Sequence, residues 1–308
     1  LLLKILKANK TRFVDLNLSN NGEKLTKKGK ILIEVLGKNT TLISLNLRDN
    51  PIDWSNISFI HLKSNKTLEN LDLSNCNLSS KVIDKLKKFL IISKRFKGLN
   101  LSSNNLTFQS EHIISEILAK NKTIKTLNLS SNKISSTIES LEKRAKTTLT
   151  GRYKSKSKYE MSRPLKVNNL LEAIRRNKTL KKLDLSSNYI CLEARKDLAR
   201  ALTSNKLITE LNLNNNDIVH ELRELLINIL INNDITSIGL RSIKISFGMV
   251  INLSQELKSN KIKLRYLNLS RNEISDNMIE ALIEVLEENT TLKNLDLSNI
   301  IGAGQTGV

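Results

Sequence analysis

Cysteine and aromatic residues are scarce in this chain of 308 residues, which has two cysteines and 4% aromatic side chains. Cys76 and Cys191 are too few for a framework of disulfide bonds. We therefore expect a reducing, cytosolic setting, meaning the host cytosol if the protein belongs to an intracellular microbe. The aromatic content is low because the hydrophobic fraction of 39% consists mainly of Leu and Ile. That fraction can build a buried core, which excludes a mostly disordered chain.

A long apolar run is also missing. Residues 1–7 are partly apolar, but they are too short and too basic for a signal peptide or a transmembrane helix. They match the end of a repeat helix. We therefore expect a partial helix over residues 1–12, in a chain that begins within a repeat of a longer protein.

One pattern of Leu and Asn, L-x-x-L-x-L-x-x-N, recurs along the whole chain and is complete in residues 180–188. Its first apolar position is occupied by Phe13, Leu42, Leu68, Phe96, Ile124, Leu180, Ile208, Ile235, Leu264 and Leu292. The successive gaps are 29, 26, 28, 28, 56, 28, 27, 29 and 28 residues. Because 56 is twice 28, we interpret residues 124–180 as two units, of which the second has lost its motif and kept its length. The chain then holds ten recognisable units and one decayed unit.

Each unit begins with a short strand. Leu267 and Leu269 are two residues apart and share one face of such a strand. Asn272 ends the strand, where its amide can bond backbone groups of neighbouring turns and form a ladder. Its counterparts are Asn21, Asn50, Asn104, Asn132, Asn188 and Asn216. Cys76 takes this place in the third unit, so we expect a structural role for it. Ile243 takes it in the eighth unit, where we expect a weaker ladder.

A helix follows each strand, because apolar residues such as Ile279, Leu282 and Leu286 recur at helical spacing. We expect asparagines such as Asn177 and Asn289 to close these helices in the left-handed conformation. One unit cannot bury both its strand and its helix. The units therefore stack into an α/β, right-handed solenoid, a horseshoe with a parallel sheet on the concave side and helices on the convex side. We expect one array over residues 1–308, with an irregular basic unit at about 143–166 and a truncated last repeat at 292–308.

A repeat of about 28 residues with a true helix and N-T/K-T-L turns resembles the ribonuclease-inhibitor-like class of leucine-rich repeat proteins. That class includes ribonuclease inhibitor, the sensor arrays of NLR immune receptors and Ran GTPase-activating protein. The resemblance covers nearly the whole chain. It implies a horseshoe fold that offers a binding surface, and it leaves the function open. Ribonuclease inhibitor is acidic and rich in cysteine, which this chain is not.

The concave face provides the candidate binding residues, because side chains beside the core leucines point out of the sheet. Between those leucines the column reads Asn17, Asn46, Asp72, Asn100, Asn128, Asp184, Asn212, Gly239, Asn268 and Asp296. The next column reads Ser19, Arg48, Ser74, Ser102, Ser130, Ser186, Asn214, Arg241, Ser270 and Ser298. We expect both columns on the surface, which is small, polar and repetitive. The candidate contacts are Arg48, Asp49, Lys182, Asp184, Glu210, Arg241, Tyr266 and Arg271.

The net charge of +20 leaves an anionic partner open. The charge lies on the helices, at their ends and in the decayed unit, where aromatic and basic residues alternate. We take this basic loop, Arg152, Tyr153, Lys154, Lys156, Lys158 and Tyr159, as a second candidate site. The alternative is that Lys, Asn and Ile are all plentiful through compositional drift, so that the loop is a solvated insertion.

We therefore expect a non-catalytic scaffold that recognises another protein. His61, His112 and His220 lie in separate units, without metal-ligand spacing or a partner nucleophile. We expect no catalytic residues, no metal, no cofactor and no small-molecule substrate. The resemblance implies one alternative, a regulator of a small GTPase or an inhibitor of an enzyme. The other alternative is attachment to nucleic acid or an anionic membrane through the basic loop.

Overall fold

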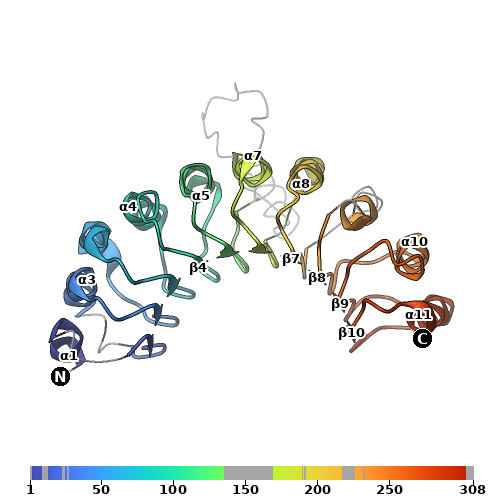
Figure 1. Ribbon diagram of the computed structural model, residues 1–308, viewed down its shortest axis with the longest axis horizontal. Coiled ribbons are helices and arrows are strands. Elements are labelled where there is room, and N and C mark those ends of the chain that lie inside the picture. The colour runs from blue at the N-terminus through green and yellow to red at the C-terminus, as the bar shows by residue number, and fades with distance from the viewer. Residues whose placement is uncertain are drawn as a thin grey trace, which may run out of the picture.

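The computed structural model describes residues 2–8, 13–22, 25, 28–134, 169–188, 190, 192–216, 226–231 and 233–302. These residues form a curved solenoid, with strands along the inner side and helices along the outer side (Figure 1). Ten strands form one parallel sheet, in which the order of the strands follows the order of the chain. The prediction of an α/β solenoid is confirmed.

The strands are three residues each: β1 (Asp15–Asn17), β2 (Ser44–Asn46), β3 (Asn70–Asp72), β4 (Gly98–Asn100), β5 (Thr126–Asn128), β6 (Lys182–Asp184), β7 (Glu210–Asn212), β8 (Ser237–Gly239), β9 (Tyr266–Asn268) and β10 (Asn294–Asp296). The α-helices are α1 (Leu2–Ala8), α3 (Gly29–Lys38), α4 (Ser80–Leu90), α5 (Phe108–Lys120), α7 (Asn169–Arg176), α8 (Leu192–Ser204), α10 (Phe247–Lys258) and α11 (Asp276–Glu288). The unit that begins at Leu42 instead has two short 3-10 helices, η1 (Trp54–Asn56) and η2 (Phe59–Ser64).

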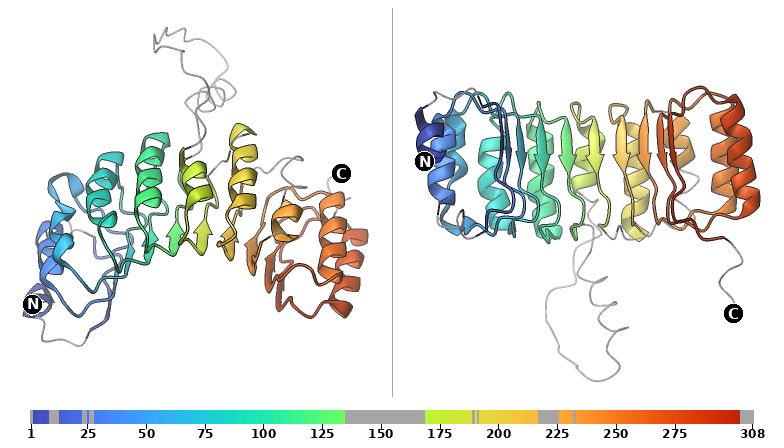
Figure 2. Two further views of the ribbon diagram at one scale, coloured as in Figure 1. Left: turned by 45° about the horizontal axis from the view of Figure 1, so that its top comes forward. Right: turned by 90° about the horizontal axis from the view of Figure 1, so that it is seen from below.

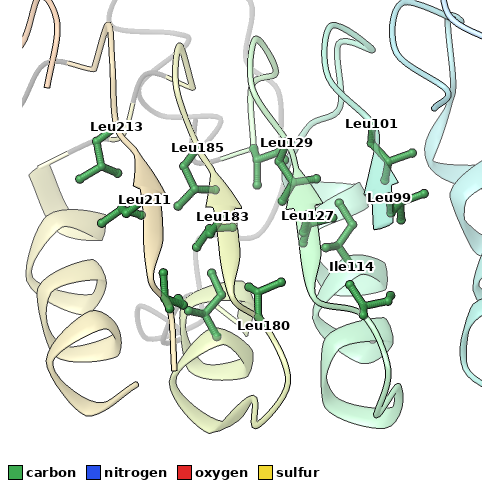
Figure 3. Packing of buried hydrophobic residues seen from close by; sticks show 14 of the residues in the cluster. Leu99, Leu101, Ile114, Leu127, Leu129, Leu180, Leu183, Leu185, Leu211 and Leu213 are labelled. Atoms are coloured by element: carbon green, nitrogen blue, oxygen red, sulfur yellow. The ribbon is translucent and has the colours of Figure 1, made fainter. Parts of the chain in front are cut away.

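Leucines of the repeated pattern form the core between the sheet and the helices. In the unit of β6, Leu180, Leu183 and Leu185 are buried. They lie between the equivalent leucines of the two neighbouring units (Figure 3). Burying one leucine contributes about 1.5–3 kcal/mol. Because each unit covers the faces of its neighbours, this contribution depends on stacking.

The predicted asparagine ladder is present. Asn104 Nδ2 donates to the carbonyl oxygens of Leu73 in the preceding unit, at 2.8 Å, and of Leu101 in its own unit, at 3.0 Å. Its Oδ1 accepts from the backbone N–H of Cys76 at 2.9 Å. Cys76 takes the same place, since its Sγ lies 3.1 Å from the Leu47 carbonyl oxygen. Burial raises the pKa of the Cys76 thiol to about 11, so the structural role expected for it is confirmed.

A second asparagine ladder runs along the helix ends. Asn121 Nδ2 donates to the Leu90 carbonyl oxygen of the preceding unit at 2.7 Å, and its Oδ1 accepts from the backbone N–H of Ile124 at 2.7 Å. The equivalent residues are Asn39, Asn65, Asn177, Asn205, Asn233 and Asn289. The expected left-handed conformation is wrong, because Asn121 is extended, with φ −73° and ψ 138°. The extended backbone lets the amide reach across to the neighbouring unit.

Strand β6 stacks directly on β5, which corrects the interpretation of residues 124–180 as two stacked units. Thr126 pairs with Lys182 and Leu127 with Leu183 in the sheet. The first ladder also continues directly, since Asn188 Nδ2 donates to the Leu129 carbonyl oxygen at 2.9 Å. The gap of 56 residues therefore holds one repeat and about 28 residues inserted into it. The basic segment at about 143–166 lies outside the described residues.

Candidate functional site

The third residue of each strand has a structural task on the concave face. In β6, Asp184 Oδ1 accepts from the backbone N–H of Ser186 at 2.9 Å and from its hydroxyl at 2.7 Å. This Asx turn bends the chain out of the strand. Asp184 Oδ2 also accepts from Asn212 Nδ2 of the next strand at 3.0 Å. The recurrence of Asn and Asp in this column therefore follows from turn formation.

The serine column expected on the concave surface is largely buried, which corrects the prediction. Ser74, Ser102, Ser186 and Ser270 are all buried. These serines follow the strand, in the turn closed by the Asn or Asp side chain, so they face their own unit. Recognition is thereby concentrated on the first residue of each strand.

The first column carries the variation. It reads Asp15, Ser44, Asn70, Gly98, Thr126, Lys182, Glu210, Ser237, Tyr266 and Asn294. Lys182 Nζ and Glu210 Oε1 form an ion pair of 2.7 Å between adjacent strands, and both side chains are about half exposed. Tyr266 is 38% exposed and lies two strands beyond Glu210.

These side chains surround a hollow of about 300 Å³ on the concave face. We call it the Tyr266 hollow; its lining is Thr126, Leu127, Asn128, Lys182, Leu183, Asp184, Glu210, Leu211, Asn212, Asn214, Ser237, Gly239 and Tyr266. On β8, between Glu210 and Tyr266, Ser237 and Gly239 contribute only small side chains or none. The hollow exists because small residues separate two larger ones.

Gly239 is required by its neighbours. A Cβ atom at this position would lie 2.6 Å from Asn212 Oδ1 and 2.7 Å from Asn214 Oδ1. Asn214 Oδ1 reaches across and accepts from the backbone N–H of Arg241 at 2.8 Å. In other units the Asn or Asp that Gly239 replaces accepts this bond. The glycine therefore deepens the hollow without leaving the turn unbonded.

The other basic candidates lie in turns after the strands. Arg241 follows β8, and its charge contributes to lowering the pKa of Asp296, mainly lowered by hydrogen bonds from Ser298. Arg271 follows β9 with a left-handed φ of 53°. Both lie near the C-terminal ends of strands that line the hollow, although neither residue lines it.

Arg48 and Asp49 lie apart from the hollow, after β2. Their side chains pair at 3.0 Å between Nε and Oδ2, and Asn75 Nδ2 donates to Asp49 Oδ1 at 2.8 Å. These contacts lower the pKa of Asp49, with the Asn75 bond as the largest cause. Strands β3, β4 and β5 separate this pair from Lys182.

Two searches limit the chemistry of the described part of the chain. No group of three or more His, Cys, Asp or Glu residues there could hold a metal ion. No helix there is long and apolar enough to cross a membrane.

Family profiles described as leucine-rich repeats match the chain at residues 38–53, 67–89, 120–138, 176–190 and 260–282. These segments coincide with the strands and ladders described above. The chain is a leucine-rich repeat protein. No curated protein matches this leucine-rich repeat protein in sequence.

Solved structures share the fold of this leucine-rich repeat protein. The leucine-rich repeat-containing protein LegL7 from Legionella pneumophila is 16% identical, with a TM-score of 0.54, and the match covers 95% of this chain and 85% of LegL7. Leiomodin-1 actin-binding site 2 is 19% identical, with a TM-score of 0.38 over 54% of this chain and 80% of its own. The Caenorhabditis elegans tropomodulin C-terminal domain is 15% identical, with a TM-score of 0.39 over 54% and 83%. These identities show the fold alone.

The structure of the leucine-rich repeat protein brings together four of the eight predicted concave residues. Lys182, Asp184, Glu210 and Tyr266 line one hollow. The small residues Ser237, Gly239 and Asn214 were missed, although Gly239 interrupts the column of Asn and Asp in the sequence. The predicted basic loop, from Arg152 to Tyr159, lies outside the described residues.

Proposed function

We propose that this leucine-rich repeat protein is a non-catalytic scaffold that recognises another protein through the Tyr266 hollow. The repeat architecture supports a protein-interaction scaffold in general. The observation that carries the specific proposal is the exposed Tyr266 beside small residues, with the Lys182–Glu210 ion pair on the far side. We also propose a cytosolic location, which the low cysteine content favours.

An anchored contact fits this geometry. Tyr and Arg side chains dominate the binding energy of many interfaces, particularly where they surround a pocket that a partner side chain fills. The sheet beneath the hollow is rigid, because Leu183, Leu211 and Leu267 are buried under it. A partner therefore meets a preformed surface and orders little of the scaffold on binding.

A photo-crosslinking residue at Ser237 tests the proposal. It is expected to label a partner protein in extracts, whereas the same residue at Lys30, on the helical side, is expected not to. Tyr266→Ala is expected to weaken binding of the labelled partner by about tenfold or more. Asn70→Ala, in the same column on β3, is the matched control. Labelling from Lys30 alone, or binding that Tyr266→Ala leaves unchanged, would contradict the proposal.

A further inference from the structure

Three lysines stack on consecutive units at the edge where the helices end and the strands begin. The backbone N–H of Lys125 donates to the Lys97 carbonyl oxygen at 2.7 Å, and that of Lys181 donates to the Lys125 carbonyl oxygen at 2.8 Å. All three residues are exposed. Since neighbouring strands lie about 4.8 Å apart, three like charges are anchored one strand spacing from each other.

A second row of lysines lies along the same edge. Lys122, Lys178 and Lys206 directly follow Asn121, Asn177 and Asn205 of the second asparagine ladder, and all three are exposed. The ladder places these turns side by side, since Asn205 Nδ2 donates to the Asn177 carbonyl oxygen at 3.1 Å. We call the two rows together the lysine edge: Lys97, Lys122, Lys125, Lys178, Lys181 and Lys206.

Fold stability explains only part of the lysine edge. Lys122 Nζ donates to the Ala119 carbonyl oxygen at 2.9 Å, as a cation at the negative end of a helix dipole should. Lys125 and Lys181 come after the helices, beyond the last turn, where this effect is weak. Like charges at directly paired positions of a sheet are destabilising. The row of Lys97, Lys125 and Lys181 therefore opposes folding.

Local neutralisation is also weak along the edge. Basic residues on the nearby helices pair within their own helix, as Arg175 and Arg176 do with Glu172. Lys97 pairs with Glu69 at 2.6 Å. Within the described residues, no carboxylate lies within 4.0 Å of Nζ of Lys122, Lys125, Lys178 or Lys181.

The lysine edge is a plane. The strands run between two level rows of loops, so successive units present their turns at the same height (Figure 2, right). The lysine edge belongs to the row of turns that joins helix ends to strand starts. A flat partner can therefore contact both rows at once.

We propose that the lysine edge docks the protein on the surface of an anionic lipid bilayer. A basic cluster near such a surface gains attraction from each lysine, and a flat array lets all six act together. Single-stranded nucleic acid favours a groove with aromatic side chains on which bases stack. The six members of the edge include no aromatic residue and no arginine, whose bidentate geometry suits phosphate recognition. The concave hollow stays free when this edge is docked.

Co-sedimentation with vesicles tests the proposal. The whole chain is mixed with phosphatidylcholine vesicles, with or without about 30% phosphatidylserine as the anionic lipid. We expect binding only to the anionic vesicles, with the partition coefficient falling at least tenfold in the triple variant Lys122→Glu, Lys125→Glu and Lys181→Glu. The matched control is Lys30→Glu, Lys81→Glu and Lys88→Glu, which changes the net charge equally on helices elsewhere, and we expect it to lose less than threefold.

Equal losses in the two triple variants would overturn the proposal, because attraction would then follow net charge alone. Failure of the native chain to bind anionic vesicles would also overturn it. So would binding of poly(U) that depends on the three lysines while vesicles do not bind, since nucleic acid would then be the partner. Circular dichroism of both variants shows that each is folded before binding is compared.

Discussion

Glu111 and Leu170 are joined by a hydrogen bond across the insertion: the Leu170 backbone N–H donates to Glu111 Oε1 at 3.2 Å. Glu111 lies in the first turn of α5, and Leu170 lies in the first turn of α7. The carboxylate thus caps the helix at the point where the chain returns to the array. Burial raises the pKa of Glu111, although hydrogen bonds from the backbone of Leu170 and Asn169 oppose the shift.

The pKa of Glu111 predicts a pH-dependent effect of Glu111→Gln. A carboxyl group whose pKa is raised by folding contributes stability below its unfolded pKa and loses it as pH rises through the folded pKa. Glutamine keeps an acceptor oxygen and carries no charge to desolvate. Relative to the native chain, Glu111→Gln should therefore gain stability as pH rises from about 4 toward neutrality. Urea unfolding across this range measures the difference, and a difference that shrinks with rising pH would contradict the assignment.

Glu111→Ala removes the cap altogether. The free energy of unfolding at neutral pH should fall by about 1 kcal/mol, the usual cost of a lost helix cap. Glu34→Ala, on the exposed side of α3, is the control and should change it little.

Excising residues 139–166 should leave the array folded. The deletion removes 28 residues and restores the spacing of the repeats between Ile124 and Leu180. The pairing of β5 with β6 and the bond from Leu170 to Glu111 do not involve the excised residues. We expect an unchanged far-UV circular dichroism shape and one cooperative unfolding transition; an unfolded product would show that the segment supports the array. The same variant lacks Arg152, Lys154, Lys156 and Lys158, so it also tests the basic-loop hypothesis.

Asn104→Ala should break one rung of the first ladder. Asn104 is buried and bonds to Leu73, Leu101 and the Cys76 backbone. Each buried group left without a partner costs about 1–3 kcal/mol, so a total loss of about 2–4 kcal/mol is expected from urea unfolding. Asn70→Ala removes an exposed amide and should cost under about 0.5 kcal/mol. Equal effects of the two variants would show that the ladder adds little.

Exchanging the charges of Lys182 and Glu210 should separate stability from recognition. The pair is about half exposed, so its contribution to stability is about 0–1 kcal/mol, and the double variant Lys182→Glu, Glu210→Lys keeps it. A partner that reads the two charges in order should bind the double variant at least tenfold more weakly. Thermal unfolding and partner titration together check this. Full binding by the double variant would remove the ion pair from the recognition surface.

The repeat length, the buried leucines and the first ladder could be predicted because they depend on local periodicity. Leu183, Leu185 and Asn188 repeat at spacings that a strand and a turn require. The extended conformation of Asn121 could not be predicted in this way, since left-handed closure is the usual local solution and a bond to the neighbouring unit selects the other. For the same reason spacing alone suited both a decayed unit and an insertion between Ile124 and Leu180.

By itself, the sequence determined that this chain is a stack of leucine-rich units with Lys182, Glu210 and Tyr266 as exceptions on its inner face. Only the tertiary structure decided that these exceptions surround one hollow and that Arg48 lies elsewhere. It also decided that Lys97, Lys125 and Lys181 form a row, because the insertion brings β5 and β6 together. The physical reason is that periodicity specifies each unit, whereas neighbourhood depends on which units stack.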